Sequence, residues 1–149
     1  MARRGNQLRT IVRLPVRRKL LLLEAAIALA IGRLMLFLLS FRRIAAWMGS
    51  TMGESPADMT PPQQDAAAEI GWAVRVMANR LPWQNVCFSQ ALAALWMLKW
   101  RRIPATVYFG VMFGEDRTLA AHAWVRSGRQ LLTGANGHEQ FTVVAKFAG

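Results

Sequence analysis

The apolar residues of this chain recur with a helical period over its first two thirds. They predict helices over about 17–39, 40–48 and 61–80, the third with a proline at its first position. A fourth helix is expected to begin at Cys87 and to end near Arg102.

The last third of the chain changes to residue types and spacings that are typical of strands. Runs of β-branched and aromatic residues predict strands over about 106–113 and 119–126, a tight Ser127-Gly128 hairpin into 129–133, and a last strand over 141–147. We expect these strands to follow one another as a meander. Helices followed by strands indicate the α+β fold class.

Composition divides the chain into three parts. Residues 1–48 form a basic helical N-terminal region, 49–63 have the composition of a linker, and 64–149 form the expected α+β domain. Residues 1–50 hold ten Lys or Arg residues against one acid, a net charge of +9 out of +11. This charge predicts an acidic partner or an anionic membrane surface. We expect no nucleic acid, because the arginines flank an apolar helix rather than alternating with aromatic residues.

The apolar run over 20–39 approaches the length of a membrane span. Glu24 and Arg33 interrupt it on opposite faces of the helix, so they cannot pair with each other, and lipid would leave both charges unpaired. We favour a helix packed on protein, with membrane-surface contact and a true span as the alternatives. The run is followed by no cleavage site typical of a signal peptide, and a lone cysteine excludes an internal disulfide. We therefore expect a cytoplasmic protein, free or bound at a membrane surface.

Cys87 is the only cysteine of the chain, and it stands where a helix is expected to begin. The positive end of a helix dipole favours the thiolate. His122 lies inside a later strand, and this is the arrangement of nucleophile and base in papain and in transglutaminases. The backbone N–H of Cys87 and a side-chain amide of Gln84 or Asn85 are candidate oxyanion donors. A small buried cysteine and a core histidine are the plain alternatives.

A metal site is the rival chemistry for these residues. Cys87, His122 and His138 are suitable ligands by type, but they are scattered and have no close ligand spacing. We therefore expect neither a metal nor another cofactor.

Several blocks of residues carry a resemblance that extends over about residues 10–147. They are Leu14-Pro15, Arg18 to Ala25, Phe41-Arg42-Arg43, Leu81-Pro82-Trp83, Cys87, Ser89 to Ala93, Leu98, Arg102 to Ala105, Gly110-Val111 and Ala121 to Val125. The blocks around Cys87 and His122 resemble the transglutaminase-like fold. Together with the N-terminal block and the short length, they look like the B2 leader peptidases of bacterial lasso peptide biosynthesis.

This resemblance implies a transglutaminase-like, papain-like cysteine protease fold with a helical N-terminal region. It implies a peptidase that removes the leader from a ribosomally made precursor peptide, with Cys87 and His122 as the first two members of a Cys–His–Asp triad. The implied partners are a separate leader-recognition protein and a macrolactam cyclase related to asparagine synthetase. The alternative is a non-catalytic scaffold that binds a partner peptide or a membrane surface through its basic N-terminal helices.

The third member of that triad is missing. The family's aspartate would fall near Thr133 or Gly134, and no acid occurs between residues 117 and 138. The group that orients His122 is then Asn136, as asparagine serves in papain-like enzymes, or Thr133, or a backbone carbonyl.

Overall fold

The computed structural model describes residues 13–84 and 86–149. Its helices are α2 (Val16–Leu38), α3 (Phe41–Met48), α4 (Pro61–Ala78) and α5 (Cys87–Trp100). Its strands are β1 (Ser50–Thr51), β2 (Thr106–Phe113), β3 (Leu119–Ser127), β4 (Gln130–Thr133) and β5 (Thr142–Ala148), with a short 3-10 helix at His138–Gln140. The predicted helices and strands are confirmed, and so is the α+β class.

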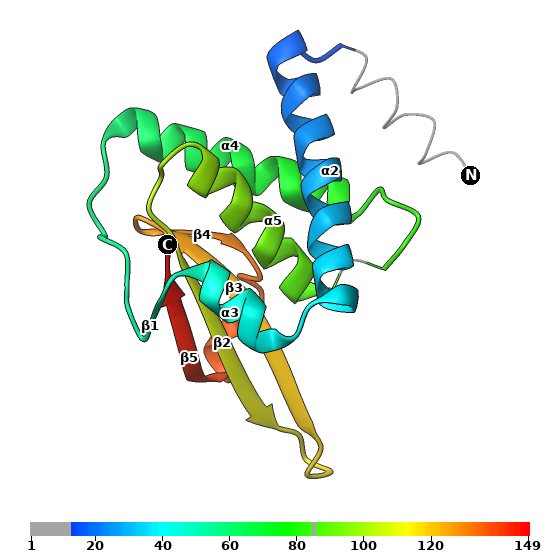
Figure 1. Cartoon of the computed structure of the whole chain (residues 1–149), viewed down its shortest axis with the longest axis vertical. Helices are drawn as coiled ribbons and strands as arrows, with labels where there is room; N and C mark the ends of the chain where they lie inside the picture. The colour runs from blue at the N-terminus through cyan, green and yellow to red at the C-terminus, as the bar shows by residue number, and fades with distance from the viewer. Residues whose placement is uncertain (1–12, 85) are drawn as a thin grey trace.

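The strands form one antiparallel sheet in the order β1-β5-β2-β3-β4. Helix α5 packs on β2, β3 and β4, and α4 packs beside it on β4. Helix α2 packs on α4 and α5 at the outer edge of this helical layer (Figure 1). The molecule is therefore a helical layer on one face of a sheet.

The expected meander is wrong for the last strand. A meander would place β5 beside β4, but β5 pairs with β2, from Thr106↔Ala148 to Val111↔Thr142. Strand β2 is largely buried, so both of its edges need hydrogen-bonding partners. Strand β5 provides the second partner, and the short β4 is left at the sheet edge.

The segment expected to be a linker begins as part of the sheet. Its first residues form β1, which pairs with β5 through Ser50↔Ala148 and Thr51↔Phe147. Further along, the backbone N–H of Ser55 donates to Thr106 Oγ1 over 2.8 Å, and both residues are buried. The stretch between the N-terminal helices and α4 is thus tied to the sheet.

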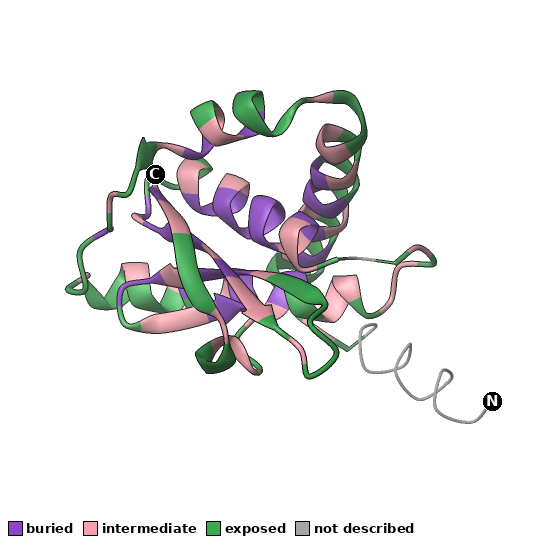
Figure 2. Ribbon diagram, turned by 90° about the horizontal axis from the view of Figure 1, so that it is seen from below, coloured by how far each residue is buried: buried purple, intermediate pink, exposed green. Residues whose placement is uncertain are grey.

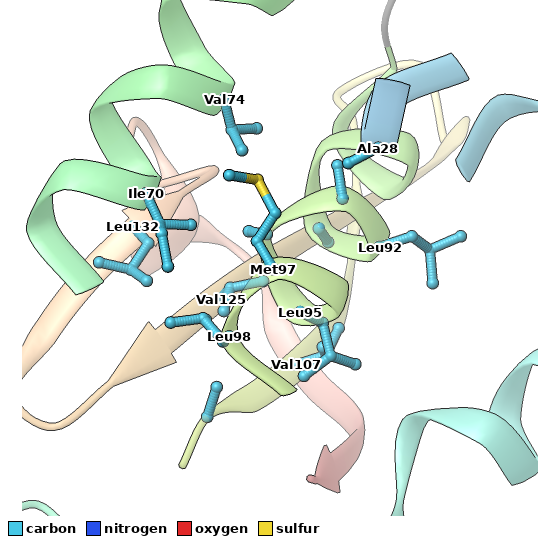
Figure 3. Close-up of a cluster of buried hydrophobic side chains, with 14 of the residues drawn as sticks. Ala28, Ile70, Val74, Leu92, Leu95, Met97, Leu98, Val107, Val125 and Leu132 are labelled. Atoms are coloured by element: carbon cyan, nitrogen blue, oxygen red, sulfur yellow. The ribbon is translucent and has the colours of Figure 1, made fainter. Parts of the chain in front are cut away.

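One hydrophobic core joins the helices to the sheet. Figure 3 shows Ala28 of α2, Val74 of α4 and Leu92 of α5 in a single cluster, which reaches Val107 and Val125 of the sheet. Buried residues gather where the helices meet one another and the sheet (Figure 2). Because α2 belongs to this core, the described part of the N-terminal region packs on the rest of the domain.

Both charges that interrupt the apolar run of α2 have partners on the protein. Glu24 accepts two hydrogen bonds of 2.7 Å from Arg101, and Arg33 Nη1 donates to the Gln84 carbonyl over 2.7 Å. In the described chain, α2 is the one helix that is long and apolar enough to cross a membrane by length and composition. Its contacts agree with the expectation of a helix packed on protein.

Candidate active site

Cys87 is the first residue of α5, and its side chain is half-buried against the core. The residue before it, Val86, caps the helix in an extended conformation without any side-chain hydrogen bond to the first turn. The first N–H groups of a helix have no partner inside the helix, so they remain available to an anion. Phe88 packs edge-on against Phe109 of β2, with 4.8 Å between ring centroids, and holds this end of α5 on the sheet.

The two side chains proposed as oxyanion donors lie in the loop before Cys87. Gln84 is exposed, and its carbonyl accepts the hydrogen bond from Arg33. Asn85 lies outside the described residues. The role of the Gln84 amide therefore stays a prediction.

His122 is half-buried on β3, and one of its ring nitrogens is held by the backbone. Its Nε2 lies 2.8 Å from the carbonyl oxygen of Gly134. A carbonyl only accepts hydrogen bonds, so Nε2 carries the proton and donates it. In the neutral ring Nδ1 is then unprotonated, which is the form that can act as a base.

Glycine is required at position 134 for this contact. Gly134 has a φ of +67°, a conformation that residues with a side chain rarely adopt. A Cβ added there would also collide with the Ala123 carbonyl and come within 2.9 Å of the Trp124 Cβ. The absence of a side chain lets the backbone of this loop lie against β3 and reach His122.

The other two candidate acceptors are placed differently. Asn136 is exposed, and no hydrogen bond joins it to His122 in the described part of the chain. Thr133 is buried, but its Oγ1 finds no hydrogen-bond partner among the residues that the structure describes. Of the three alternatives left open by the sequence, the backbone carbonyl is the one that makes the bond.

Aromatic rings surround the imidazole on its face of the sheet. The His122 ring lies 5.8 Å from the Trp124 ring, with 28° between the ring planes, and 5.1 Å from the Phe141 ring. Trp124 also stacks on Tyr108 at 5.6 Å and contacts His138. Sequence reasoning missed these neighbours, although the two-residue spacing of His122 and Trp124 places both on the same face of a strand.

Charged groups beyond Tyr108 tie this face to the segment before α4. The Tyr108 hydroxyl donates to Glu54 over 2.7 Å and accepts a hydrogen bond from Arg126. The bond from Tyr108 lowers the pKa of Glu54, while burial and the same bond raise the pKa of Tyr108.

The thiol and the imidazole are not joined in this structure. Ala123 and Val125 belong to the core beneath the helices, so by strand alternation His122 points to the opposite face of β3. No hydrogen bond connects Cys87 with His122 within residues 13–84 and 86–149. Strand β4 pairs with β3 only from Val125 to Ser127, which leaves the neighbouring edge of β3 without a strand partner at His122.

The rival metal site gains no support from the geometry. In the described residues, no three His, Cys, Asp or Glu side chains gather as a potential metal site.

Comparison with known proteins gives one match. The family model described as the transglutaminase-like superfamily matches residues 35–146, about three quarters of the chain, and this span includes Cys87 and His122. No curated protein and no solved structure matches the chain.

Proposed function

The chain belongs to the transglutaminase-like superfamily, which includes cysteine peptidases, and on that premise we propose a cysteine peptidase that removes the leader from a lasso precursor peptide. Cys87 is the nucleophile, and His122 is the base and then the acid. The substrate is a ribosomally made precursor, presented by a separate leader-recognition protein. The released core passes to a macrolactam cyclase related to asparagine synthetase.

The first half-reaction forms an acyl-enzyme. The Cys87 sulfur attacks the carbonyl carbon of the bond between leader and core, while its proton passes to Nδ1 of His122. Backbone N–H groups at the start of α5, together with the Gln84 amide, stabilise the oxyanion. Nδ1–H then protonates the amine of the core as the C–N bond breaks, and the leader remains attached to the sulfur as a thioester.

The second half-reaction releases the leader. Nδ1 takes a proton from water, the resulting hydroxide attacks the thioester carbonyl, and the sulfur leaves and regains its proton from His122. While Nε2–H is bonded to the Gly134 carbonyl, Nδ1 is the ring nitrogen that can take up and give back a proton. A neutral carbonyl stabilises the imidazolium less than a carboxylate does, because it carries only a partial charge.

The observation that carries the proposal is the hydrogen bond from His122 Nε2 to Gly134. It supplies what the missing aspartate would supply, namely a fixed acceptor that leaves Nδ1 free to act as the base. Support also comes from the position of the only cysteine at an uncapped helix start.

The alternative, a non-catalytic scaffold, is favoured by a different observation. Cys87 and His122 make no hydrogen bond in the described chain, and the sequence has no acid at the triad position. Catalytic contacts often shorten only when substrate is bound. The peptidase therefore requires a substrate-bound state in which His122 Nδ1 reaches the Cys87 sulfur past the unpaired edge of β3.

The test is to incubate the full chain with its precursor and the leader-recognition protein and to weigh the products by mass spectrometry. We expect free leader and free core, and no cleavage by Cys87→Ala. That substitution should change the free energy of unfolding by no more than about 1–2 kcal/mol. Cleavage by a folded Cys87→Ala variant would exclude the covalent mechanism. If the native chain binds the precursor but does not cleave it, the result would favour the non-catalytic scaffold.

A further inference from the structure

The outward side of α2 is apolar along its whole length. Its exposed large side chains, each between 39% and 73% exposed, are Val16, Leu20, Leu23, Ile27, Ile31, Leu34, Phe37 and Leu38. At 100° per residue they all fall within a stripe about 120° wide. The helix residues that are buried against α4 and α5, such as Ala25 and Leu29, lie on the opposite side.

This outward stripe is long and carries no acid. A helix of this length extends for about 35 Å, and the two charges in its middle, Glu24 and Arg33, turn toward the protein and find partners there. Folded soluble proteins rarely expose a continuous apolar surface of this size without a function for it. The stripe therefore has the properties of a surface that another molecule or a membrane covers.

Cations flank the stripe at both ends. Arg13, Arg17 and Lys19 stand at the start of α2, Arg42 and Arg43 stand just beyond its end, and all five are exposed. None of the five forms a salt bridge within the described residues. Apolar side chains between two cationic ends match an anionic bilayer, because the apolar residues enter the acyl region while the cations meet the lipid headgroups.

We propose that α2 lies flat on an anionic membrane, with its outward stripe in the interface. The helix does not cross the bilayer in this arrangement, because its inner side is packed on α4 and α5. A second copy of the chain is a poorer occupant. Both ends of the stripe are cationic, so two stripes would bring like charges together whether they packed parallel or antiparallel.

The proposal is independent of the chemistry of Cys87, yet it bears on where that chemistry would happen. In the loop before Cys87, the Gln84 carbonyl accepts a hydrogen bond from Arg33 of α2. A membrane-bound α2 would therefore hold the start of α5 close to the lipid surface.

The test measures flotation of the full chain with vesicles of phosphatidylcholine alone and with vesicles that also contain phosphatidylglycerol. We expect binding to the anionic vesicles at least about tenfold tighter than to the neutral ones, and weaker binding as salt is added. The double variant Leu23→Gln, Ile27→Gln should lose at least about tenfold in affinity. The double variant Arg42→Gln, Arg43→Gln should lose most of the preference for the anionic lipid.

The matched control is Leu119→Gln with Val144→Gln, which changes two equally exposed apolar residues on β3 and β5. It should bind vesicles as the native chain does, and circular dichroism should show that every variant is folded. Equal affinity of the Leu23, Ile27 variant and the control for anionic vesicles would overturn the proposal. The proposal would also be overturned if the native chain did not bind vesicles and instead formed a dimer, or a complex with the leader-recognition protein, in lipid-free solution. In that case the Leu23, Ile27 variant, and not the control, would lose this dimer or complex.

Discussion

Arg33 of α2 donates a hydrogen bond of 2.7 Å to the backbone carbonyl of Gln84, in the loop that leads to Cys87. The residue before it, Gly32, packs closely on the first turn of α5, where an added Cβ would stand 3.1 Å from the Ser89 carbonyl. Helix α2 therefore supports the loop before Cys87 and the first turn of α5. This contact connects the basic N-terminal region, for which the sequence predicts an acidic partner or a membrane surface, with the segment that carries Cys87.

Replacing Arg33 should impair cleavage more than folding. Arg33→Ala frees the Gln84 carbonyl and loosens the loop before the nucleophile, so kcat should fall by roughly tenfold with a smaller change in KM. Arg129→Ala is the matched control, because it removes the same charge from an exposed surface pair with Asp58. Steady-state kinetics with the precursor measures both. Equal kcat values for the two folded variants would contradict the positioning role.

Substitutions at Gly134 and Asn136 should have different effects on turnover. Gly134→Ala forces a side chain into a left-handed backbone position against β3, so the carbonyl should move away from His122 and turnover should fall at least roughly tenfold. Asn136→Ala should leave turnover nearly unchanged, because that side chain is exposed. A tenfold loss in Asn136→Ala with a normal KM would instead make the asparagine the orienting group.

Two buried threonines offer a matched test of stability. Thr133 is fully buried and its hydroxyl has no partner in the described chain, so Thr133→Val should raise the free energy of unfolding by about 1 kcal/mol. Thr106 is equally buried, but its hydroxyl accepts a hydrogen bond from the Ser55 N–H. Thr106→Val should therefore lower the free energy of unfolding by about 1–3 kcal/mol. Urea unfolding measures both. A destabilised Thr133→Val would indicate a polar partner, such as a bound water.

Two leucines of α2 test whether the N-terminal helix belongs to the core. Leu29 is fully buried, so Leu29→Ala should lower the free energy of unfolding by about 2–5 kcal/mol. Leu34 is 54% exposed, and Leu34→Ala should change the free energy of unfolding in lipid-free solution by less than about 0.5 kcal/mol. Thermal unfolding of the full chain distinguishes the two. If both substitutions changed the free energy of unfolding by similarly small amounts, α2 would contribute little to the stability of the core.

The sequence by itself determined the local structure and the position of the candidate nucleophile. Helical periodicity depends on residues three and four positions apart, and strand patterns on alternate positions, so the elements follow from short stretches of the chain. Proline at the start of α4 and the turn before Cys87 mark helix boundaries in the same local way. These signals placed the lone thiol at the first turn of α5.

Only the tertiary structure decided what surrounds that thiol and the imidazole. The pairing of β5 with β2 depends on the unpaired edge of a central strand, which no local pattern encodes. Residue types favoured Asn136 as the partner of His122, but the left-handed turn at Gly134 presents a backbone carbonyl, and every residue has one. Likewise, the partners of Glu24 and Arg33 lie 77 and 51 residues away along the chain, so only the packing of α2 on α5 shows that both charges are satisfied.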